Sequence, residues 1–284
     1  MRDDASARRV RGMSGVGGGR ERGRSRIGWL RRRAHGFYSV AGVLLTVGFL
    51  LSLLGLWALS GLTDGVMDGE TLRFDEGVLL WMDARSSSRL DVLALKVTAL
   101  GDTLVVITIA LVAGTLLWLL KQRAHAALLA AAVGGVMLIH PLLKWIFDRP
   151  RPQLFEWRTH YAASSSYPSG HAALSMVLLA VLAYIVHRLA DRRWIGVAAM
   201  LLAGIAVLLV GLSRLYLGVH YPSDVVAGYT VGFAWAVFCA LALEALRHRR
   251  RSRRDAERRI DGPGDVVEEI DPEGARRASG TGGG

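Results

Sequence analysis

The sequence has little of what holds small secreted or metal-binding proteins together. Cys239 is the only cysteine among its 284 residues, which excludes an intramolecular disulfide framework and a multi-cysteine metal site. Only 21% of the residues are charged, 52% are hydrophobic, and the mean hydropathy is +0.32. Soluble domains carry about 25% charged residues among dispersed apolar ones. Here the apolar residues form uninterrupted blocks, which predicts an integral membrane protein.

Acidic and basic side chains are absent from six apolar segments. A bilayer core about 30 Å thick is crossed by about 20 residues of helix, and the fourth segment reaches spanning length when it is extended toward Pro168 and His187. The apolar residues do not alternate with polar ones, so a β-barrel is excluded and each span must be helical. We therefore predict an all-α, polytopic membrane protein with six transmembrane helices: Val40–Leu59, Leu104–Leu120, Ala126–Leu143, Ala172–Val186, Ile195–Ser213 and Val225–Leu243.

The basic residues are distributed unevenly between the segments that connect the apolar runs. The two chain ends and the turns at 121–125 and 187–194 hold 26 of the 35 Lys and Arg residues, and the other connecting segments hold nine. Positive segments mark the cytoplasmic face. We therefore expect a plasma-membrane protein with both termini in the cytoplasm and its longer loops outside. The net charge of +11 is a topology signal, and no nucleic-acid partner is expected.

The chain is expected to divide into a membrane domain and two basic tails. Residues 1–36 are rich in Gly and Arg, and residues 247–284 mix Arg with acidic residues and end in Gly. Both are predicted to be disordered cytoplasmic tails around a six-span domain at 37–246. In the first outer loop, residues 72–100 mix large apolar side chains with charges. This pattern predicts short amphipathic helices at the membrane interface.

Three polar clusters lie at helix ends on the expected outer side. The first, Lys144–Pro152, follows the third span; the second, Ser166–His171, precedes the fourth; the third, Ser213–Asp224, joins the fifth to the sixth. Cations and backbone N–H groups stabilise phosphate oxygens, while one histidine can attack phosphorus and another can protonate a leaving group. The clusters supply these groups: Lys144, Arg151, Arg214, His171, His220 and Asp224.

Spacing within the clusters favours the same chemistry. Ser169, Gly170 and His171 open a predicted helix, so its N–H groups and dipole would face a bound anion. Gly170 permits close approach of the chain. His220 and Asp224 are four residues apart, a spacing at which the carboxylate can accept the Nδ1 proton and leave Nε2 nucleophilic.

The three clusters resemble the signature of the type 2 phosphatidic acid phosphatase (PAP2) superfamily. The patterns are Lys-x6-Arg-Pro, Pro-Ser-Gly-His and Ser-Arg-x5-His-x3-Asp, and each is present in order without a departure. The resemblance covers about Val40 to Leu246 and implies a PAP2-like bundle. Any one of these motifs alone would be a weak indication, but three in the right order and topology are specific.

The resemblance implies a metal-independent phosphoryl transfer in two steps, without a cofactor. It assigns His220 as the nucleophile that forms a phosphohistidine and Asp224 as the residue that orients it. It assigns His171 to protonate the departing oxygen and then to activate water. The residues that it implies in phosphate binding are Lys144, Arg151, Ser169, Gly170 and Arg214. The outer loops also lack the paired acids typical of a Mg²⁺ site.

The expected substrate is a lipid-linked phosphate or diphosphate, because the reactive residues cap transmembrane helices. The compact layout resembles undecaprenyl-diphosphate phosphatases. Phosphatidic acid or phosphatidylglycerophosphate hydrolysis, and phosphoryl transfer to a lipid or glycan acceptor, remain alternatives that would use the same residues. A transporter would more often carry charges within its spans, and six apolar spans argue against a soluble vanadate-dependent haloperoxidase. The oligomeric state is left open.

Other residues near the clusters receive structural interpretations. Arg149 has the chemistry of Arg151 but the wrong register, so we assign it a structural or auxiliary role. His140, beside Pro141, is interpreted as a hydrogen-bonded neutral histidine at a proline kink. Gly228 and Gly232 are expected to allow close helix packing within the bundle.

Overall fold

The computed structural model describes residues 40–159 and 165–260, and these residues contain helices and no strands. The predicted all-α class is confirmed. The predicted tail at residues 1–36 lies outside the described residues, as do residues 261–284. In chain order the helices are α2 (Val40–Met67), α3 (Leu72–Asp83), α4 (Ser88–Thr98), the 3₁₀ turn η1 (Ala99–Gly101), α5 (Thr103–Leu119), α6 (Arg123–Phe147), α7 (Gly170–Leu189), α8 (Arg193–Tyr216) and α9 (Pro222–Ile260).

Five helices are each long and apolar enough to cross a membrane: α2 from Thr46, α6, α7, α8 and α9 as far as Ser252. The sixth candidate span is a bent pair, Ser88–Gly101 with Thr103–Leu119, whose two parts differ in direction by 51°. With 17 residues, α5 alone is at the lower limit for a span. The multi-pass prediction is therefore confirmed, with five candidate spans among the described residues, or six if the bent pair forms a single span.

Two helices extend further than predicted. α2 continues beyond Leu59 to Met67 and is followed by Gly69 with φ of +77°, a conformation that glycine adopts without steric strain. α9 continues to Ile260, although a disordered tail was expected from residue 247. The reason is that Arg, Ala and Glu are good helix formers, and this segment contains no Gly or Pro. By internal contacts the chain divides into Met1–Ala245 and Leu246–Gly284.

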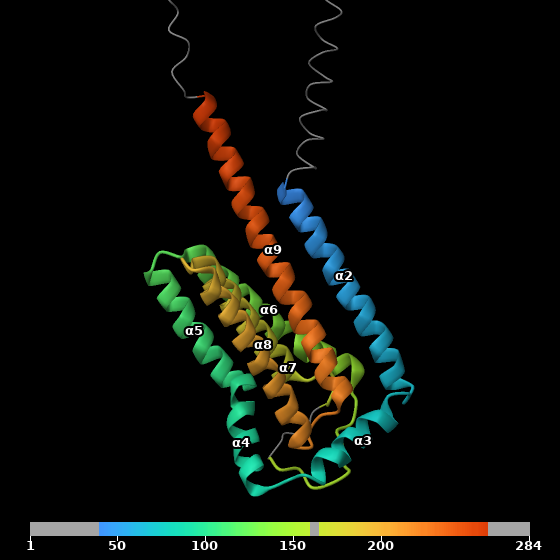
Figure 1. The fold of residues 1–284 in the computed structure, drawn as a ribbon. Coiled ribbons are helices and arrows are strands. Elements are labelled where there is room, and N and C mark those ends of the chain that lie inside the picture. The colour runs from blue at the N-terminus through green and yellow to red at the C-terminus, as the bar shows by residue number, and fades with distance from the viewer. Residues whose placement is uncertain (1–39, 160–164, 261–284) are drawn as a thin grey trace, which may run out of the picture. The chain divides into compact units, whose positions relative to one another are not determined.

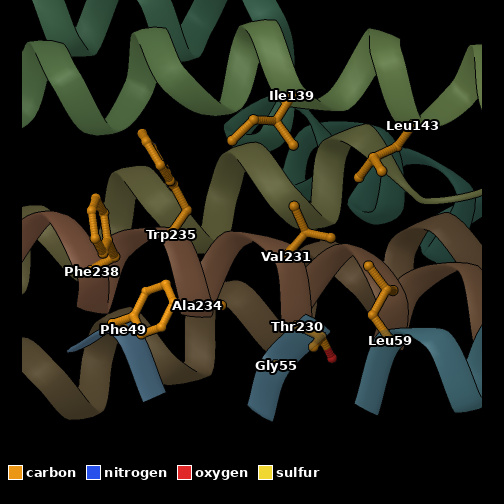
Figure 2. A pocket seen from close by; sticks show the side chains of 10 residues that line it. All are labelled: Phe49, Gly55, Leu59, Ile139, Leu143, Thr230, Val231, Ala234, Trp235 and Phe238. Carbon is orange, nitrogen blue, oxygen red and sulfur yellow. The ribbon is translucent and has the colours of Figure 1, made fainter. Parts of the chain in front are cut away.

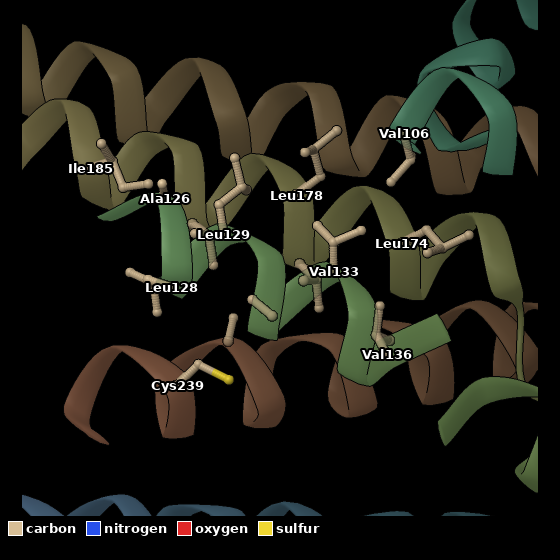
Figure 3. Packing of buried hydrophobic residues seen from close by; sticks show 14 of the residues in the cluster. Val106, Ala126, Leu128, Leu129, Val133, Val136, Leu174, Leu178, Ile185 and Cys239 are labelled. Carbon is tan, nitrogen blue, oxygen red and sulfur yellow. The ribbon is translucent and has the colours of Figure 1, made fainter. Parts of the chain in front are cut away.

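α7 is the central helix of the bundle and packs against α5, α6 and α8. Figure 3 shows the apolar cluster in which Leu174 and Leu178 of α7 pack with Leu129 and Val133 of α6, and with Cys239 of α9. Large apolar side chains on the outer surface are instead exposed, as expected for helices that face lipid. Close packing of complementary helix surfaces is the main force that holds such helices together in a membrane.

Small residues allow α9 to approach α7 closely. A Cβ atom added at Gly232 would lie 2.7 Å from the Ala173 carbonyl oxygen and 2.9 Å from the Met176 Cβ. A Cβ at Gly228 would lie 2.9 Å from the Cβ of Ala172. The interpretation of Gly228 and Gly232 as packing residues within the bundle is therefore confirmed.

The connections of the bundle place all three polar clusters at one end. In Figure 1, α3, α4, the α6–α7 connection and the α8–α9 connection lie at this end, whereas the α5–α6 and α7–α8 turns lie at the other. The first residues of α2 also lie at the opposite end (Figure 1). Segments that are far apart in the sequence can therefore form one site.

The contact at Gly232 generates a stability prediction. The Gly232→Ala variant is expected to lose about 1–3 kcal/mol of stability, because the added methyl group would press on the α7 backbone. The matched control is Gly114→Ala on α5, since a Cβ there meets nothing within 4 Å. The measurement is the melting temperature of each variant in detergent. Equal melting temperatures for the two variants would contradict the close packing of α9 on α7.

Candidate active site

Hydrogen bonds join the three polar clusters in pairs. Ser166 donates from its backbone N to the Arg149 carbonyl (2.8 Å) and from its Oγ to the Pro150 carbonyl (3.1 Å), which joins the second cluster to the first. The backbone N of Ser169 donates to the Asp224 carbonyl (2.9 Å), joining the second cluster to the third. Arg151 Nη1 completes the set by donating to the Val219 carbonyl (2.7 Å). The clusters predicted from sequence therefore meet in one place.

His220 lies at the centre of this site and is fully buried. Its Nδ1 is 3.4 Å from Asp224 Oδ2, and its Nε2 is 3.3 Å from Arg151 Nη1. A guanidinium group has donors and no acceptor, so the Nε2 atom accepts and the ring proton resides on Nδ1. In this tautomer the Nδ1 proton faces a carboxylate, and the Nε2 lone pair faces a cation.

The surroundings of His220 keep its ring neutral. Burial lowers the pKa of His220 well below its usual value, and the positive charges of Arg214, Arg151 and Lys144 lower the pKa further. The neutral form of the imidazole, with its Nε2 lone pair, is therefore favoured.

The three predicted cations come from different parts of the chain: Lys144 from α6, Arg151 from the α6–α7 connection and Arg214 from α8. Arg214, at the end of α8, is buried and donates from Nη1 to Thr98 Oγ1 at 2.8 Å, which ties α8 to α4. Lys144 occupies the last turn of α6, and its electrostatic neighbours include Arg151, Arg214 and Asp224.

His171, in the first turn of α7, lies among the same charged side chains. The groups that act on it electrostatically are Arg214, His220, Lys144 and Arg151. Gly101 of η1 packs closely against the backbone of His171. A Cβ atom at Gly101 would lie 2.8 Å from the His171 carbonyl oxygen. The residues assigned by the motifs are therefore brought together by four helices, α6, α7, α8 and α9, and by the connections between them.

The start of α7 presents a polar group that has no partner among the described residues. Ser169 is the N-cap residue but makes no side-chain capping bond, and its buried Oγ lacks a hydrogen-bond partner among the described residues.

Gly170 packs closely against His140, a contact that the sequence did not reveal, because a Cβ at Gly170 would lie 2.7 Å from the ring of His140. His140 is hydrogen-bonded, as expected, through Nε2 to the Pro168 carbonyl at 3.3 Å.

Sequence reasoning missed Asp75 and Ser223, and it set Arg149 aside. Arg149 is buried and binds the carboxylates of both Asp75 and Asp224. No signal in the sequence distinguishes Asp75 from the other acidic residues of the first outer loop.

Among the described residues, no group of three or more His, Cys, Asp or Glu side chains is placed to hold a metal ion. The expectation of metal independence stays a prediction.

An apolar pocket of about 370 Å³ lies between α2, α6 and α9. In Figure 2, Phe49, Trp235 and Phe238 gather at one end of it, and Leu59 and Leu143 lie at the other. Leu143 directly precedes Lys144 in the sequence. The pocket thus reaches the helix turn that carries one of the site's cations.

Comparisons with known proteins identify the family to which the chain is similar. Residues 125–247 match the model of the PAP2 superfamily. The chain is 30% identical to phosphatidylglycerophosphatase B of Bacillus subtilis over 137 residues, 48% of this chain and 66% of that protein. It is 35% identical to an undecaprenyl-diphosphatase of Sulfolobus acidocaldarius over 80 residues, 28% of this chain and 34% of that protein. The matched regions thus span less than two thirds of these relatives.

A solved structure has the same fold. The transmembrane PAP2-type phosphatidylglycerolphosphate phosphatase from Bacillus subtilis superposes with a TM-score of 0.62 at 21% identity, covering 70% of this chain and 96% of that one. The matched family region contains all three polar clusters completely. The chain therefore carries a PAP2 superfamily domain at residues 125–247.

Proposed function

We propose that this protein is a membrane-embedded phosphatase that hydrolyses a lipid-linked phosphate or diphosphate through a phosphohistidine on His220. The observation that carries the proposal is the environment of His220, whose Nε2 faces Arg151 while Nδ1 faces Asp224. A neutral imidazole with this tautomer is a nucleophile that an adjacent carboxylate can stabilise as it becomes cationic. The phosphatase and diphosphatase names of the relatives support the same reaction class.

The reaction proceeds in two balanced steps. In the first, His220 Nε2 attacks phosphorus and the bond from phosphorus to the leaving oxygen breaks. His171, whose protonated form is favoured by the negative charge of the bound phosphate, gives that oxygen its proton. In the second, His171 takes a proton from water while the water oxygen attacks phosphorus, and the phosphorus–nitrogen bond breaks. Inorganic phosphate leaves, and both histidines return to their starting protonation states.

Phosphate is held by positive charge and by backbone dipoles. Lys144, Arg151 and Arg214 neutralise the equatorial oxygens as negative charge develops on them. Ser169 and Gly170 stand at the N-terminal end of α7, where backbone N–H groups and the helix dipole favour an anion. The buried Ser169 hydroxyl, which has no partner among the described residues, supplies a further donor.

The lipid character of the substrate follows from the position of the site at the ends of spanning helices. The apolar pocket between α2, α6 and α9 begins beside Lys144 and offers a surface for a hydrocarbon tail. Undecaprenyl diphosphate is the substrate that we propose first, on the compact layout and the diphosphatase relative. Phosphatidylglycerophosphate or phosphatidic acid is the second candidate, supported by the phosphatidylglycerophosphatase B relative.

A substrate panel tests the reaction class. Protein purified in detergent is expected to release inorganic phosphate from undecaprenyl diphosphate, phosphatidylglycerophosphate or phosphatidate at an equal rate with and without EDTA. The reason is that all groups of the proposed mechanism come from the chain itself. Activity that EDTA abolishes and Mg²⁺ restores would contradict it. Phosphate appearing on an added lipid or glycan acceptor would identify a phosphotransferase.

Alanine variants separate the roles of the two histidines. His220→Ala is expected to abolish turnover and the acid-labile phosphoenzyme, since the nucleophile is gone. His171→Ala is expected to lower kcat by about 10²–10⁴-fold, the usual contribution of general acid–base catalysis. Turnover and ³²P trapping on the folded variants provide the measurement. Wild-type activity in either variant would remove that residue from the mechanism.

The site is proposed to face the outside of the cell, with both termini in the cytoplasm, because the positive turns lie at the opposite end of the bundle. In intact cells, a membrane-impermeant maleimide is expected to label Gln153→Cys, which is exposed in the α6–α7 connection. It is expected not to label Asp191→Cys, which is exposed in the α7–α8 turn. Wild-type protein, with its buried Cys239, is the control. The reverse labelling pattern would overturn the orientation.

A further inference from the structure

We propose that Asp75 and Arg149 are positioning residues for the His220–Asp224 pair. A buried carboxylate–guanidinium–carboxylate bridge starts on α3, in the first connecting segment, and ends on the Asp224 side chain. Its function is to hold one Asp224 oxygen so that the other stays on the nucleophilic histidine. This inference rests on the function proposed above and adds residues from outside the three motifs.

Arg149 is the centre of the bridge. Its Nη1 donates to Asp224 Oδ1 at 2.6 Å and to Ser223 Oγ at 2.8 Å, and its Nη2 donates to Asp75 Oδ2 at 3.0 Å. The guanidinium carbon also lies 4.2 Å from the centre of the Tyr221 ring, a distance at which a cation is attracted to an aromatic face. One guanidinium group is thus held by two carboxylates and one ring, and it is 8% exposed.

Asp75 connects the bridge to the start of α9 a second time. Its Oδ1 accepts from the Ser223 backbone N at 3.1 Å, and its Oδ2 accepts from Ser223 Oγ at 2.5 Å. Thr71 Oγ1 donates to Oδ2 as well, at 3.0 Å. Asp75 has no exposed surface, so a carboxylate on an otherwise amphipathic surface helix is turned completely inward. Burial of a charge is unfavourable unless it is paired in this way.

The two carboxylate oxygens of Asp224 have different partners. Oδ1 receives Arg149, while Oδ2 accepts from the Tyr221 backbone N at 2.9 Å and lies 3.4 Å from His220 Nδ1. Rotation of the carboxylate would break the bond from Arg149, so Oδ2 remains directed at the histidine. A carboxylate that orients a catalytic histidine contributes through the tautomer and the stabilisation of the imidazolium.

Asp75 also balances charge around Asp224. Two carboxylates share the single positive charge of Arg149, which leaves Asp224 with negative charge to stabilise the His220 imidazolium that forms when Nε2 is phosphorylated. Without the Asp75 charge, Arg149 would act fully on Asp224 and weaken it as an acceptor. Neither Asp75 nor Arg149 is among the residues proposed to bind phosphate. The effect is therefore expected on the chemical step and not on phosphate affinity.

The main test is Asp75→Asn, which keeps the shape of the side chain and removes its charge. Its kcat is expected to fall about 10- to 100-fold, by analogy with the loss of residues that orient metal-binding histidines through hydrogen bonds. Its KM, and the inhibition constant of inorganic phosphate, are expected to stay within about twofold of wild type. The reason is that the residues proposed to bind phosphate are unchanged, so the affinity for the ground state is retained. Both are measured with the lipid phosphate that the wild-type protein hydrolyses, in detergent.

Arg158→Gln is the matched control. Arg158 likewise bridges two carboxylates, Asp83 of α3 and Asp91 of α4. Its Nη1 also donates to the Tyr216 carbonyl at the end of α8, but the described residues show no bond from Arg158 to His220 or Asp224. This variant is expected to keep the wild-type kcat per folded molecule. If Asp75→Asn does not fold, Ser223→Ala decides instead: it removes the hydroxyl bonds to Asp75 and Arg149 and is expected to lower kcat in the same selective way.

Each outcome supports or overturns the inference. A selective fall in kcat for Asp75→Asn or Ser223→Ala, with Arg158→Gln unaffected, supports it. An unchanged kcat, or a rise in KM and in the phosphate inhibition constant without a fall in kcat, overturns it. If the wild-type protein hydrolyses no member of the lipid phosphate panel, the proposed function fails. That result is distinguishable because it precedes any comparison of variants.

Discussion

The hydrogen bond from the Ser169 amide to the Asp224 carbonyl joins the beginnings of α7 and α9, and the geometry of the site depends on it. The bonds from Ser166 to Arg149 and from Arg151 to Val219 complete the connection of three segments. Non-helical backbone near a bilayer must find partners within the protein. The connecting segments satisfy one another's polar groups, and in doing so they bring both histidines and the cations to one end of the bundle.

Positive charge is the second feature of the site. Lys144, Arg151 and Arg214 surround His220, which is kept neutral by burial and by these cations. A concentration of cations around a neutral nucleophile destabilises the empty site and favours a bound oxyanion, which explains why one arrangement serves both binding and chemistry. Arg149 differs from these three, because Asp75 and Asp224 already balance its charge.

The sequence predicted the helices and motif residues because both depend on local patterns. Uncharged apolar runs specify spans, and motif spacing specifies which side chains share a site. The inward turn of Asp75 was not predictable, since eight acidic residues lie between 60 and 103 and only tertiary packing selects one. Arg149 was set aside because it does not occupy the arginine position of the Lys-x6-Arg-Pro motif. Its role depends on contacts with Asp75 and Asp224, which motif spacing does not specify.

The most direct test of the central claim is a structure of the detergent-purified protein with bound orthovanadate, a tetrahedral oxyanion that resembles phosphate. The account predicts vanadium next to His220 Nε2, with the oxygens within hydrogen-bonding distance of Lys144, Arg151, Arg214 and the start of α7. Binding elsewhere, or an anion at this end of the bundle that His220 does not touch, would contradict it.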